Sequence, residues 1–566
     1  MPAKINSEYD IGKAFQAIEG ELMASMVRNM KRHRAWEDAE GIHWEQWQAL
    51  QLKALEQYKK NNQKRFKGQF KDINKEIESL IYAANQQGGM DQEKVILNAI
   101  KRGVSVKKVS KGATAEFFRL NDRKLDALIK ATVDDMERAE TAVLRMANDQ
   151  YRKVIYNAQV YANTGAGTYE KAVDMATKDM LSAGLNCVEY ANGARHTLSD
   201  YADMAIRTAS KRAYLQGEGQ KRQEWGLHLV IMNKRGNPCP KCLPFVGKVL
   251  IDDVWSGGSK ADGNYPLMSV AISAGLYHPR CKDGHTTYFP GISTPPDDKF
   301  TRKELADIEE QNKLEARQQY SEQQYAKYSR LARFSLDDDN KYKYRLRANE
   351  LEEQDILLES KRFPDRKTAD KYYRGSTEIL WKKLHKKEKE ALWKYTGPKF
   401  MDINSALRTG NQATDTIQEY IDKMTEAISK NRLRESTWVR RGINQKGLEK
   451  FLDLEDIREE SLHDIVGKTF VEKGFMSTGV SDDAGFSGIN LKICLPKGTQ
   501  AVYAEPFSCY GNTNTNGTWD GKQKGSYVGS EAELIIQRNS KFRVKSVEKN
   551  ADGEIKEVVL LLIEQI

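Results

Sequence analysis

The chain lacks any uninterrupted apolar run long enough to cross a membrane, although it has 566 residues. Its first residues, "MPAKINSEYDIGKAFQ", also lack the charged and then apolar layout of a secretory signal. Charged residues make up 30% of the chain and its mean hydropathy is −0.70, so we expect a soluble protein with no membrane partner. The length exceeds what one hydrophobic core can serve, which indicates roughly two to four domains.

Cysteine is scarce, and six cysteines in a chain of this length do not make a disulfide scaffold. Cys239 and Cys242 form a C-x2-C pair, and His278 and Cys281 form an H-x2-C pair. Two such pairs supply the four soft ligands of a tetrahedral zinc ion, so the sequence predicts a structural Zn2+ site here. His285 is an alternative ligand, and the simpler interpretation is a set of reduced thiols beside a hydrogen-bonded histidine.

The basic residues are spread along the chain rather than gathered in one block. The net charge is +10, which permits contact with nucleic acid or an acidic partner without requiring it. Local concentrations occur in "MKRHR" (30–34) and "KKNNQKRFKGQFK" (59–71). These runs either contact DNA or form solvated helix faces.

Two segments of different character come first. Residues 1–225 repeat apolar residues at helical spacing, with Gly217 and Gly219 as expected stop signals of the last helix. Residues 226–296 alternate short β-like runs with turn residues and contain the Cys and His pairs. The double proline at 295–296 marks the clearest boundary of the chain.

Two further segments complete the chain. Residues 297–365 are dense in charge and poor in apolar residues, which is typical of solvent-bridging helices that connect domains. Residues 366–566 place helices before strands, the order of an α+β domain. We therefore expect a multidomain protein: a long-helix, all-α N-terminal region with a small zinc-ribbon-like Cys/His module, a charged helical connector, and a C-terminal α+β domain.

Three stretches of the first half carry a family resemblance. "YADMAIRTASKRA", "CPKCLPFVGKV" and "YPLMSVAISAGLYHPRCKDGHTTYFPG" resemble the phage minor capsid protein 2 family, which is related to head-morphogenesis proteins. The similarity covers most of residues 1–296 and is strongest over 195–292. It implies a virion protein present in few copies inside the head near the portal, with portal and capsid proteins as partners and packaged DNA within reach.

Two glutamates stand one residue apart near the C-terminus. Glu531 and Glu533 precede the apolar run "LIIQ", which reads as a β-strand. Side chains at i and i+2 of a strand share a face, so we expect both carboxylates on one side. On an exposed edge such a pair is only a solvated surface. Motifs upstream of the pair are needed before a catalytic role can be assigned to Glu531 and Glu533.

The order of those motifs carries the second resemblance. An arginine motif in "TWVRRGI", a Ser-Thr motif in "KGFMSTGVS" and Glu-x-Glu in "SEAEL" follow one another as in mono-ADP-ribosyltransferases of the clostridial binary-toxin type. The flanking segment 379–408, which ends in the Ile-Asn-x-x-Leu-Arg pattern, also resembles these enzymes. The similarity covers roughly 370–566 and implies an ADP-ribosyltransferase domain that uses NAD+ as a substrate.

The resemblance implies roles for the acidic pair. Cleavage of the ribose–nicotinamide bond builds oxocarbenium-like charge on the sugar, which a carboxylate stabilises. The match gives this role to Glu533, while Glu531 orients or deprotonates the acceptor nitrogen. A Glu rather than Gln at the first position resembles the arginine-modifying branch, so a protein arginine is the expected acceptor.

The remaining family positions bind NAD+. Arg441 matches the arginine that holds the pyrophosphate, although an offset to Arg440 leaves the alternative open. Gly442 matches the residue whose backbone meets the nicotinamide. Ser477 is expected to hold Glu533 in position, and Thr478 to support that strand. No Gly-x-Gly-x-x-Gly or Walker loop is seen in this domain, as expected when NAD+ is consumed rather than held as a redox cofactor.

Some positions depart from the family pattern. Gly479 stands in the third place of Ser-Thr-Ser, and Val528 stands where an aromatic is usual, with Tyr527 one place earlier. Both departures bear on contact with the target. "YYRGS" (372–376) mimics the arginine motif but precedes the helical part, so Arg374 is interpreted as a surface residue.

Together these features predict a phage head protein with a fused, arginine-directed mono-ADP-ribosyltransferase. It would reside in the virion and act on a host protein in the host cytoplasm after ejection with the DNA. Two alternatives stay open. One is a purely structural capsid protein with an inactive transferase-like domain, and the other is an NAD+ glycohydrolase in which water replaces the protein acceptor.

Overall fold

The structure of the protein is a computed structural model. It describes residues 7–38, 41–106, 108–109, 111–161, 168–190, 192–234, 238–294, 299–410, 412–452, 454, 465–484, 487–509, 531–550 and 554–565. The double proline at 295–296 lies outside these residues. The chain divides into two compact units, Met1–Asn349 and Glu350–Ile566, and each is considered by itself.

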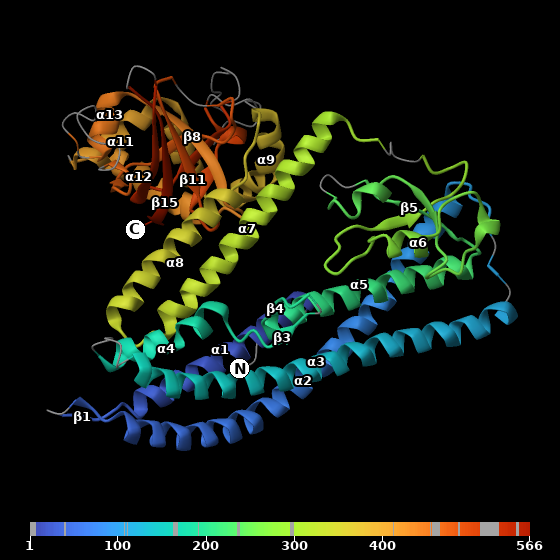
Figure 1. The fold of residues 1–566 in the computed structure, drawn as a ribbon. Coiled ribbons are helices and arrows are strands. Elements are labelled where there is room, and N and C mark those ends of the chain that lie inside the picture. Colours follow the sequence, from blue (N-terminus) through green and yellow to red (C-terminus); the bar gives the residue numbers. More distant parts are fainter. Residues whose placement is uncertain are drawn as a thin grey trace. The chain divides into compact units, whose positions relative to one another are not determined.

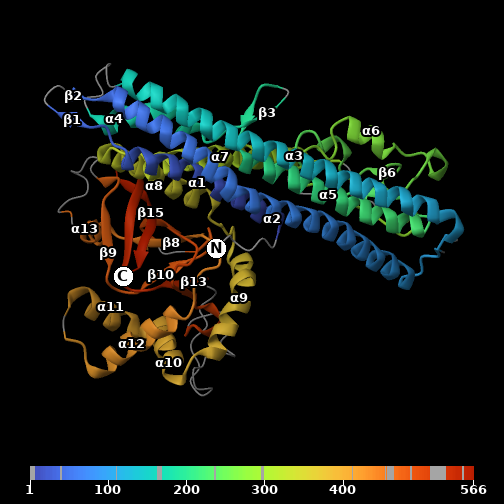
Figure 2. The same ribbon diagram turned by 90° about the horizontal axis from the view of Figure 1, so that it is seen from below.

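Long helices build the first unit (Figure 1). They are α1 (Glu8–Arg32), α2 (Trp44–Lys101), α3 (Lys111–Tyr161), α4 (Tyr169–Ala183) and α5 (Leu198–Glu224). Helices α2, α3 and α5 lie side by side in both views (Figures 1 and 2) and contact one another. Apolar residues at helical spacing form their common core, in which Phe15, Trp47 and Tyr151 are fully buried. Two short hairpins, β1 (Glu37–Asp38) with β2 (Gly41–Ile42) and β3 (Val188–Glu189) with β4 (Arg195–His196), join the helices.

Glycines inside α5 let it approach its neighbours closely. A Cβ on Gly217 would lie 1.9 Å from the carbonyl oxygen of Asn85 in α2, and one on Gly219 would lie 2.3 Å from the Cβ of Trp255. The helix therefore continues through both glycines and ends only at Glu224. The interpretation of these glycines as stop signals is wrong, because close packing rather than chain reversal requires them.

A small sheet and two loops form the Cys/His part of the first unit. The sheet has the order β6-β5-β7, with β5 (Leu229–Met232), β6 (Val249–Ile251) and β7 (His285–Thr287) paired antiparallel. Around it lie η2 (Leu243–Phe245), η3 (Lys260–Asp262) and α6 (Met268–Ser273). A separate apolar cluster fills this part, and Cys242 belongs to it.

The charged region after the Cys/His part is helical, as expected. It forms α7 (Arg302–Phe334) and α8 (Asp338–Glu359). A capping box begins α7: the Glu304 amide donates to the Thr301 hydroxyl at 3.2 Å, and the Thr301 amide donates to the Glu304 carboxylate at 2.7 Å. The division between the two units falls within α8.

The second unit is built on an eight-stranded sheet with the order β12-β13-β10-β8-β11-β15-β14-β9. Neighbouring strands pair antiparallel except β11 with β15, which are parallel. The strands are β8 (Thr437–Ile443), β9 (Thr469–Glu472), β10 (Met476–Gly479), β11 (Ile489–Leu495), β12 (Ala501–Tyr503), β13 (Glu533–Ile536), β14 (Ser540–Lys549) and β15 (Ile555–Gln565). This is the expected α+β architecture.

Helices cover both faces of the β13 region. They are α9 (Arg366–Lys383), α10 (Lys386–Lys394), η4 (Tyr395–Lys399), α11 (Phe400–Thr409), α12 (Asp415–Ser429) and α13 (Gln445–Leu452). Leu534 and Ile536 lie in the cluster that includes residues of α9 and α13, whereas Ile535 lies in the cluster of α10, α11 and α12. Those three helices lie together beside the sheet (Figure 2). By strand alternation Glu533 faces the same side as Ile535.

The last turns of α8 pack in the second unit. Ile356 and Leu357 contact a buried cluster of Trp438, Cys494 and Leu561. The carboxylate of Glu353 forms ion pairs with Arg543 and, at 2.8 Å, with Lys545 on β14.

Within the described ranges, no helix combines the length and apolarity that a membrane span needs.

Candidate active site and metal centre

Three neighbouring strands bring the distant sequence motifs together. In the order β13-β10-β8, Gly479 of β10 pairs with Glu533 on one side and with Arg440 on the other. Ser477 lies two residues before Gly479 on β10, and Arg441 directly follows Arg440 on β8. The arginine, Ser-Thr and Glu-x-Glu motifs therefore lie on adjacent strands of one sheet.

Glu533 is the first residue of β13, and its side chain is buried. Burial raises the pKa of Glu533 to about 7, and the negative charges of Glu531 and Glu505 act in the same direction. A hydrogen bond with Ser477 and the charge of Arg441 lower it. Near neutral pH this carboxyl group therefore exchanges between its neutral and its ionised form.

Glu531 is placed by a turn and not by the strand. The strand begins at Glu533, and Ala532 before it has φ +48°, a left-handed conformation that interrupts side-chain alternation. The expectation that both carboxylates share a face of one strand is therefore wrong. The two carboxylates are nevertheless close enough for the charge of Glu531 to raise the pKa of Glu533. Burial and then the charge of Glu505 raise the pKa of Glu531 itself.

Glu505, which the sequence analysis did not single out, holds this turn. It begins the 3-10 turn η5 (Glu505–Phe507) after β12, and it is 1% exposed. Its Oε2 accepts hydrogen bonds from the backbone amides of Glu531 at 3.1 Å and Ala532 at 3.0 Å. No motif in the sequence marks this residue, since its partners lie beyond a long intervening segment.

The two arginines of β8 have different surroundings. Arg441 donates from Nη1 to the backbone carbonyl of Ser477 at 3.1 Å, and its Nε is buried without a hydrogen-bond partner among the described residues. Burial lowers the pKa of Arg441, but a guanidinium stays charged in proteins. Arg440 instead donates to the carbonyl of Asp482 at 2.8 Å and pairs with its carboxylate at 3.3 Å. Only Arg441 has a buried donor left for a ligand.

Helical residues support β10 from one side. The Ser477 hydroxyl donates to the Tyr395 hydroxyl at 3.3 Å, and Tyr395 in turn donates to the carbonyl of Phe475 at 3.0 Å. Asn404 donates from Nδ2 to Tyr395 at 3.1 Å and accepts from the amide of Phe475 at 2.9 Å. Asn404 is the Asn of the Ile-Asn-x-x-Leu-Arg pattern, so the sequence contained a signal for it. Tyr395 carried none.

Arg408, which ends that pattern, forms a two-point ion pair with the buried Glu472, with N–O distances of 3.0 Å. The positive charge of Arg408 lowers the pKa of Arg441. A second cation therefore acts on the predicted pyrophosphate residue.

The remaining predicted residues have structural surroundings. Thr478 is buried and donates from its hydroxyl to the carbonyl of Leu534 at 2.8 Å, which ties β10 to β13. Gly442 pairs with Asn490 of β11. Arg374 forms a two-point ion pair with Asp370 of the same helix and lies outside this group. The departures at Tyr527 and Val528 lie outside the described residues.

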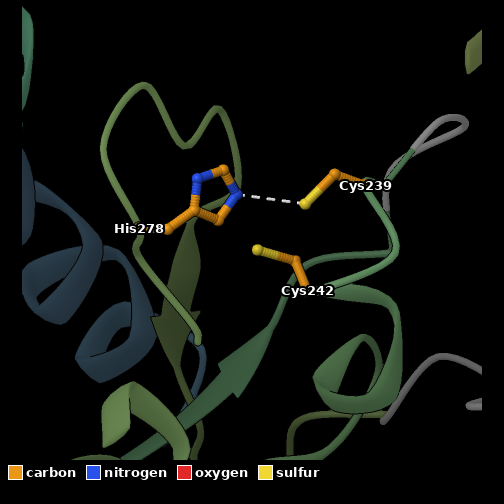
Figure 3. A group of neighbouring side chains, drawn as sticks. All are labelled: Cys239, Cys242 and His278. Carbon is orange, nitrogen blue, oxygen red and sulfur yellow. Dashed lines mark hydrogen bonds between the residues drawn. The ribbon is translucent and has the colours of Figure 1, made fainter. Parts of the chain in front are cut away.

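Three of the four predicted Cys and His ligands in the first unit lie together as one group, and Cys281 belongs to a second group that shares Cys242. The Cys239 sulfur lies 3.1 Å from Nε2 of His278, and the sulfurs of Cys242 and Cys281 are 3.5 Å apart. The ligand atoms of Cys239, Cys242 and His278 lie within 4.8 Å of one another and turn toward a common point (Figure 3). Cys242, Cys281 and Asp283 form an overlapping group of the same size. The donor set of thiols and imidazole suits a soft ion such as Zn2+.

His285 does not join this cluster. Its Nε2 lies 3.0 Å from Nη2 of Arg222, and its Nδ1 lies 2.6 Å from the Tyr277 hydroxyl. Arginine only donates, so Nε2 accepts and Nδ1 carries the proton. Both ring nitrogens are thus engaged in a buried network with Arg222 and Asp252, and the alternative ligand set with His285 is not supported. Asp283, which the sequence analysis did not consider, lies nearer, with its Oδ2 3.9 Å from the Cys281 sulfur.

Comparison with known proteins gives two family matches. The model described as phage minor capsid protein 2 matches residues 7–355. The model described as ADP-ribosyltransferase exoenzyme matches residues 369–564. A search of curated proteins found no match.

Several solved toxin structures resemble the second part of the chain. The Clostridium limosum C3 exoenzyme is 21% identical, covering 37% of this chain and 100% of that chain with a TM-score of 0.29. C3stau2 from S. aureus with NAD is 23% identical; the match covers 36% of this chain and 99% of that chain, with a TM-score of 0.28. The toxin BECa of a binary enterotoxin of C. perfringens with NADH is 19% identical, covering 36% and 50% with a TM-score of 0.29. At these identities and TM-scores the likenesses carry no conclusion about activity.

Proposed function

Because the chain belongs to the phage minor capsid protein 2 family and carries an ADP-ribosyltransferase exoenzyme domain over residues 369–564, we propose that this capsid protein transfers ADP-ribose from NAD+ to a protein of the host. Both resemblances seen in the sequence are thereby confirmed at the level of the family. The observation that carries the proposed activity is the convergence of Glu533, Ser477 and Arg441 on adjacent strands, with Glu533 buried.

Glu533 acts on the ribose. In its ionised form it stabilises the positive charge that develops as the bond from C1′ to the nicotinamide nitrogen breaks. Nicotinamide leaves with the electron pair of that bond. The charge of Arg441 favours the ionised carboxylate, which is the form the reaction needs.

Glu531 acts on the acceptor. An arginine nitrogen of the target forms the new bond to C1′, and Glu531 takes the proton that this nitrogen loses. Its raised pKa makes it a better base than an exposed carboxylate. The short turn at Ala532 keeps it within electrostatic reach of Glu533.

Arg441 holds the pyrophosphate of NAD+. Its buried Nε has no hydrogen-bond partner among the described residues, so it can add a charge-assisted bond to a phosphate oxygen. Gly442 follows directly on the same strand and brings its backbone toward the nicotinamide. Thr478 keeps β10 and β13 in register through its bond to Leu534.

The test is to incubate the full chain with labelled NAD+ and a host-cell lysate, beside Glu533→Gln. We expect label on discrete protein bands with the wild type and none with the variant. Absence of NAD+ turnover by the folded wild type would overturn the proposal and favour a purely structural capsid protein.

Transfer and hydrolysis are separated by Glu531→Gln. If Glu531 serves the protein acceptor, this variant loses arginine labelling while much of the NAD+ hydrolysis remains. Free ADP-ribose as the sole product of the wild type would instead indicate an NAD+ glycohydrolase. An ADP-ribose located on an arginine by mass spectrometry of the labelled protein would identify the acceptor.

We further propose that the protein resides in the virion, inside the head near the portal, and acts in the host cytoplasm after ejection. The capsid family of residues 7–355 supports this location. Purified virions should contain the full chain, and its absence from them would contradict the proposal. Co-purification with portal protein from disrupted heads would test the partner.

Zn2+ is the ion we propose for the cluster of Cys239, Cys242, His278 and Cys281. The donor atoms of Cys239, Cys242 and His278 lie within 4.8 Å of one another, and Cys281 is close to Cys242. The part around them has only a small apolar core, for which a bound ion would supply stability. Metal analysis of the purified protein should give about one zinc per chain. Cys242→Ser should lose it, whereas Cys187→Ser, a free cysteine outside the cluster, should retain it.

Packaged DNA is the nucleic acid we propose as a partner. A cleft of about 530 Å³ between α5 and the loop before β7 is lined by several cations: Arg207, Lys211, Arg212, Arg280 and Lys282. Asp203 and Glu315 neutralise part of this charge, but Lys211 and Arg212 form no ion pair among the described residues. Removing both should lower the salt dependence of duplex binding by about two counterions. Lys59→Gln with Lys60→Gln tests the other candidate for DNA contact, the run 59–71, in which both side chains are exposed on α2.

A further inference from the structure

We propose that Glu505 is a positioning residue for the two candidate catalytic carboxylates, because its buried side chain fixes the turn from which Glu531 and Glu533 project. This inference rests on the proposed function of that site. Glu505 belongs to η5 at the end of β12 and lies far from the acidic pair in the sequence.

The contacts of Glu505 are made to the backbone of the pair itself. One oxygen, Oε2, accepts the amide hydrogens of Glu531 and Ala532, at 3.1 and 3.0 Å. Glu505 is 1% exposed and Ala532 is fully buried, so water has little access to the bond between them. Two amides on one oxygen need a strong acceptor, and an ionised carboxylate meets that need better than a neutral amide.

The turn needs such a restraint because of Ala532. Its φ of +48° is a conformation that residues with a Cβ rarely adopt. It persists only where the surroundings define it. Two more bonds fix its flanks: the Val480 amide donates to the Ala532 carbonyl at 3.0 Å, and the Ala504 amide donates to the Glu533 carbonyl at 2.8 Å. The side chain of Glu505, in η5, adds the hydrogen bonds to the amides of Glu531 and Ala532.

The charge of Glu505 has a second effect. It raises the pKa of both Glu531 and Glu533. The groups around Glu533 are Glu531, Glu505, Ser477, Tyr395 and Arg441, and burial together with the two glutamates outweighs Ser477 and Arg441. Removal of one of the negative charges therefore lowers the pKa of Glu533.

The experiment measures NAD+ turnover by the full chain carrying Glu505→Gln, across pH. We expect kcat to fall by roughly 10- to 100-fold with KM for NAD+ little changed, because a misplaced Glu533 affects the transition state and not ground-state binding. The rise of kcat with pH should move to lower pH than in the wild type. A residue with a merely structural role would not move that profile.

Two further variants separate geometry from charge. Ala532→Gly removes the conformational strain, so it should restore part of the kcat of Glu505→Gln without restoring the pH profile. Glu388→Gln is the matched control: it removes another buried carboxylate, one that accepts from the His385 amide and pairs with Lys430 away from the site. It should lower stability and leave the pH profile unchanged.

Hydrogen exchange gives a readout that does not need activity. In Glu505→Ala the amides of Glu531 and Ala532 should exchange faster, while Glu388→Gln leaves them protected. A Glu505→Gln variant with wild-type kcat and pH profile, or unchanged exchange in Glu505→Ala, would overturn the inference. An inactive wild type whose amides respond as expected would overturn the proposed function alone.

Discussion

Glu533 combines a buried position with a proposed role that needs its charge. Its pKa of about 7 means that it is largely protonated in mild acid and ionised above neutrality. Since the ionised form stabilises the oxocarbenium-like ribose, kcat should rise as pH increases through about 7 and then level off. The measurement is kcat for NAD+ consumption from about pH 5 to 9. A rate that falls over this range would contradict the assignment.

Replacing the planar guanidinium of Arg441 by the ammonium of lysine should weaken the binding of NAD+. In Arg441→Lys the charge remains but the two-point hydrogen bonding does not, so we expect KM for NAD+ to rise by roughly 10-fold or more. Arg440→Lys is the neighbouring control, because Arg440 is bound to Asp482 and should change KM by less than about twofold. Equal effects of both variants would show that the pyrophosphate position has been misassigned.

Individual site residues were predictable to different degrees. Motif order was sufficient to predict that Arg441, Ser477 and Glu533 belong to one group, and their adjacent strands agree with it. Their roles in catalysis stay a prediction. The left-handed Ala532 and the carboxylate of Glu505 were not predictable, since both depend on hydrogen bonds between η5 and the start of β13. Strand alternation was misleading at Glu531 for the same reason.

Helix α5 shows what a glycine inside a helix can do. Gly217→Ala would place a Cβ 1.9 Å from the Asn85 carbonyl oxygen and push α2 and α5 apart. We expect a loss of stability of about 1–3 kcal/mol, seen as a lower midpoint of thermal unfolding. Gly68→Ala, in α2 with no atom within 4 Å of its Cβ, should instead stabilise by roughly 0.5–1 kcal/mol. A change in stability of the same sign in both variants would contradict the explanation by close packing.

The second compact unit begins at Glu350, within the segment 297–365 that the sequence assigns to a connector. Residues 350–365 include Ile356, Leu357 and Glu353, which pack on or pair with the sheet. A fragment 366–566 should therefore be less stable than a fragment 350–566 by several kcal/mol, since each buried Ile or Leu contributes about 1.5–3 kcal/mol. Thermal unfolding of the two fragments tests this, and equal midpoints would contradict it.

Element types were more predictable than element limits. Helical spacing identified the long helices and the helical connector, and the order of helices before strands identified the α+β class of residues 366–566. The end of α5 was missed because the contact that requires Gly217 involves Asn85 on another helix. The periodicity of a sequence describes one segment at a time, whereas close packing depends on the residues of two helices.

The molecule as a whole separates its two candidate sites into two units. The metal cluster belongs to the first and Glu533 to the second. Removal of zinc by a chelator should therefore lower the unfolding temperature of the first unit and leave NAD+ turnover by the second within about twofold of its initial value. Calorimetry and an NAD+ assay on the same sample test this. Loss of turnover in step with zinc would show that the units depend on each other.

Helix α8 also has a meaning for the ancestry of this chain. The capsid family match extends to residue 355, yet Glu353 already pairs with Arg543 and Lys545 of the transferase sheet. The segment that matches the capsid family and the second unit therefore share residues of one helix. A recombination event that exchanged only residues 366–566 would leave the partners of Ile356 and Glu353 behind. Phage lineages that gain or lose such a domain would therefore have to exchange the end of this helix with it, or adapt it afterwards.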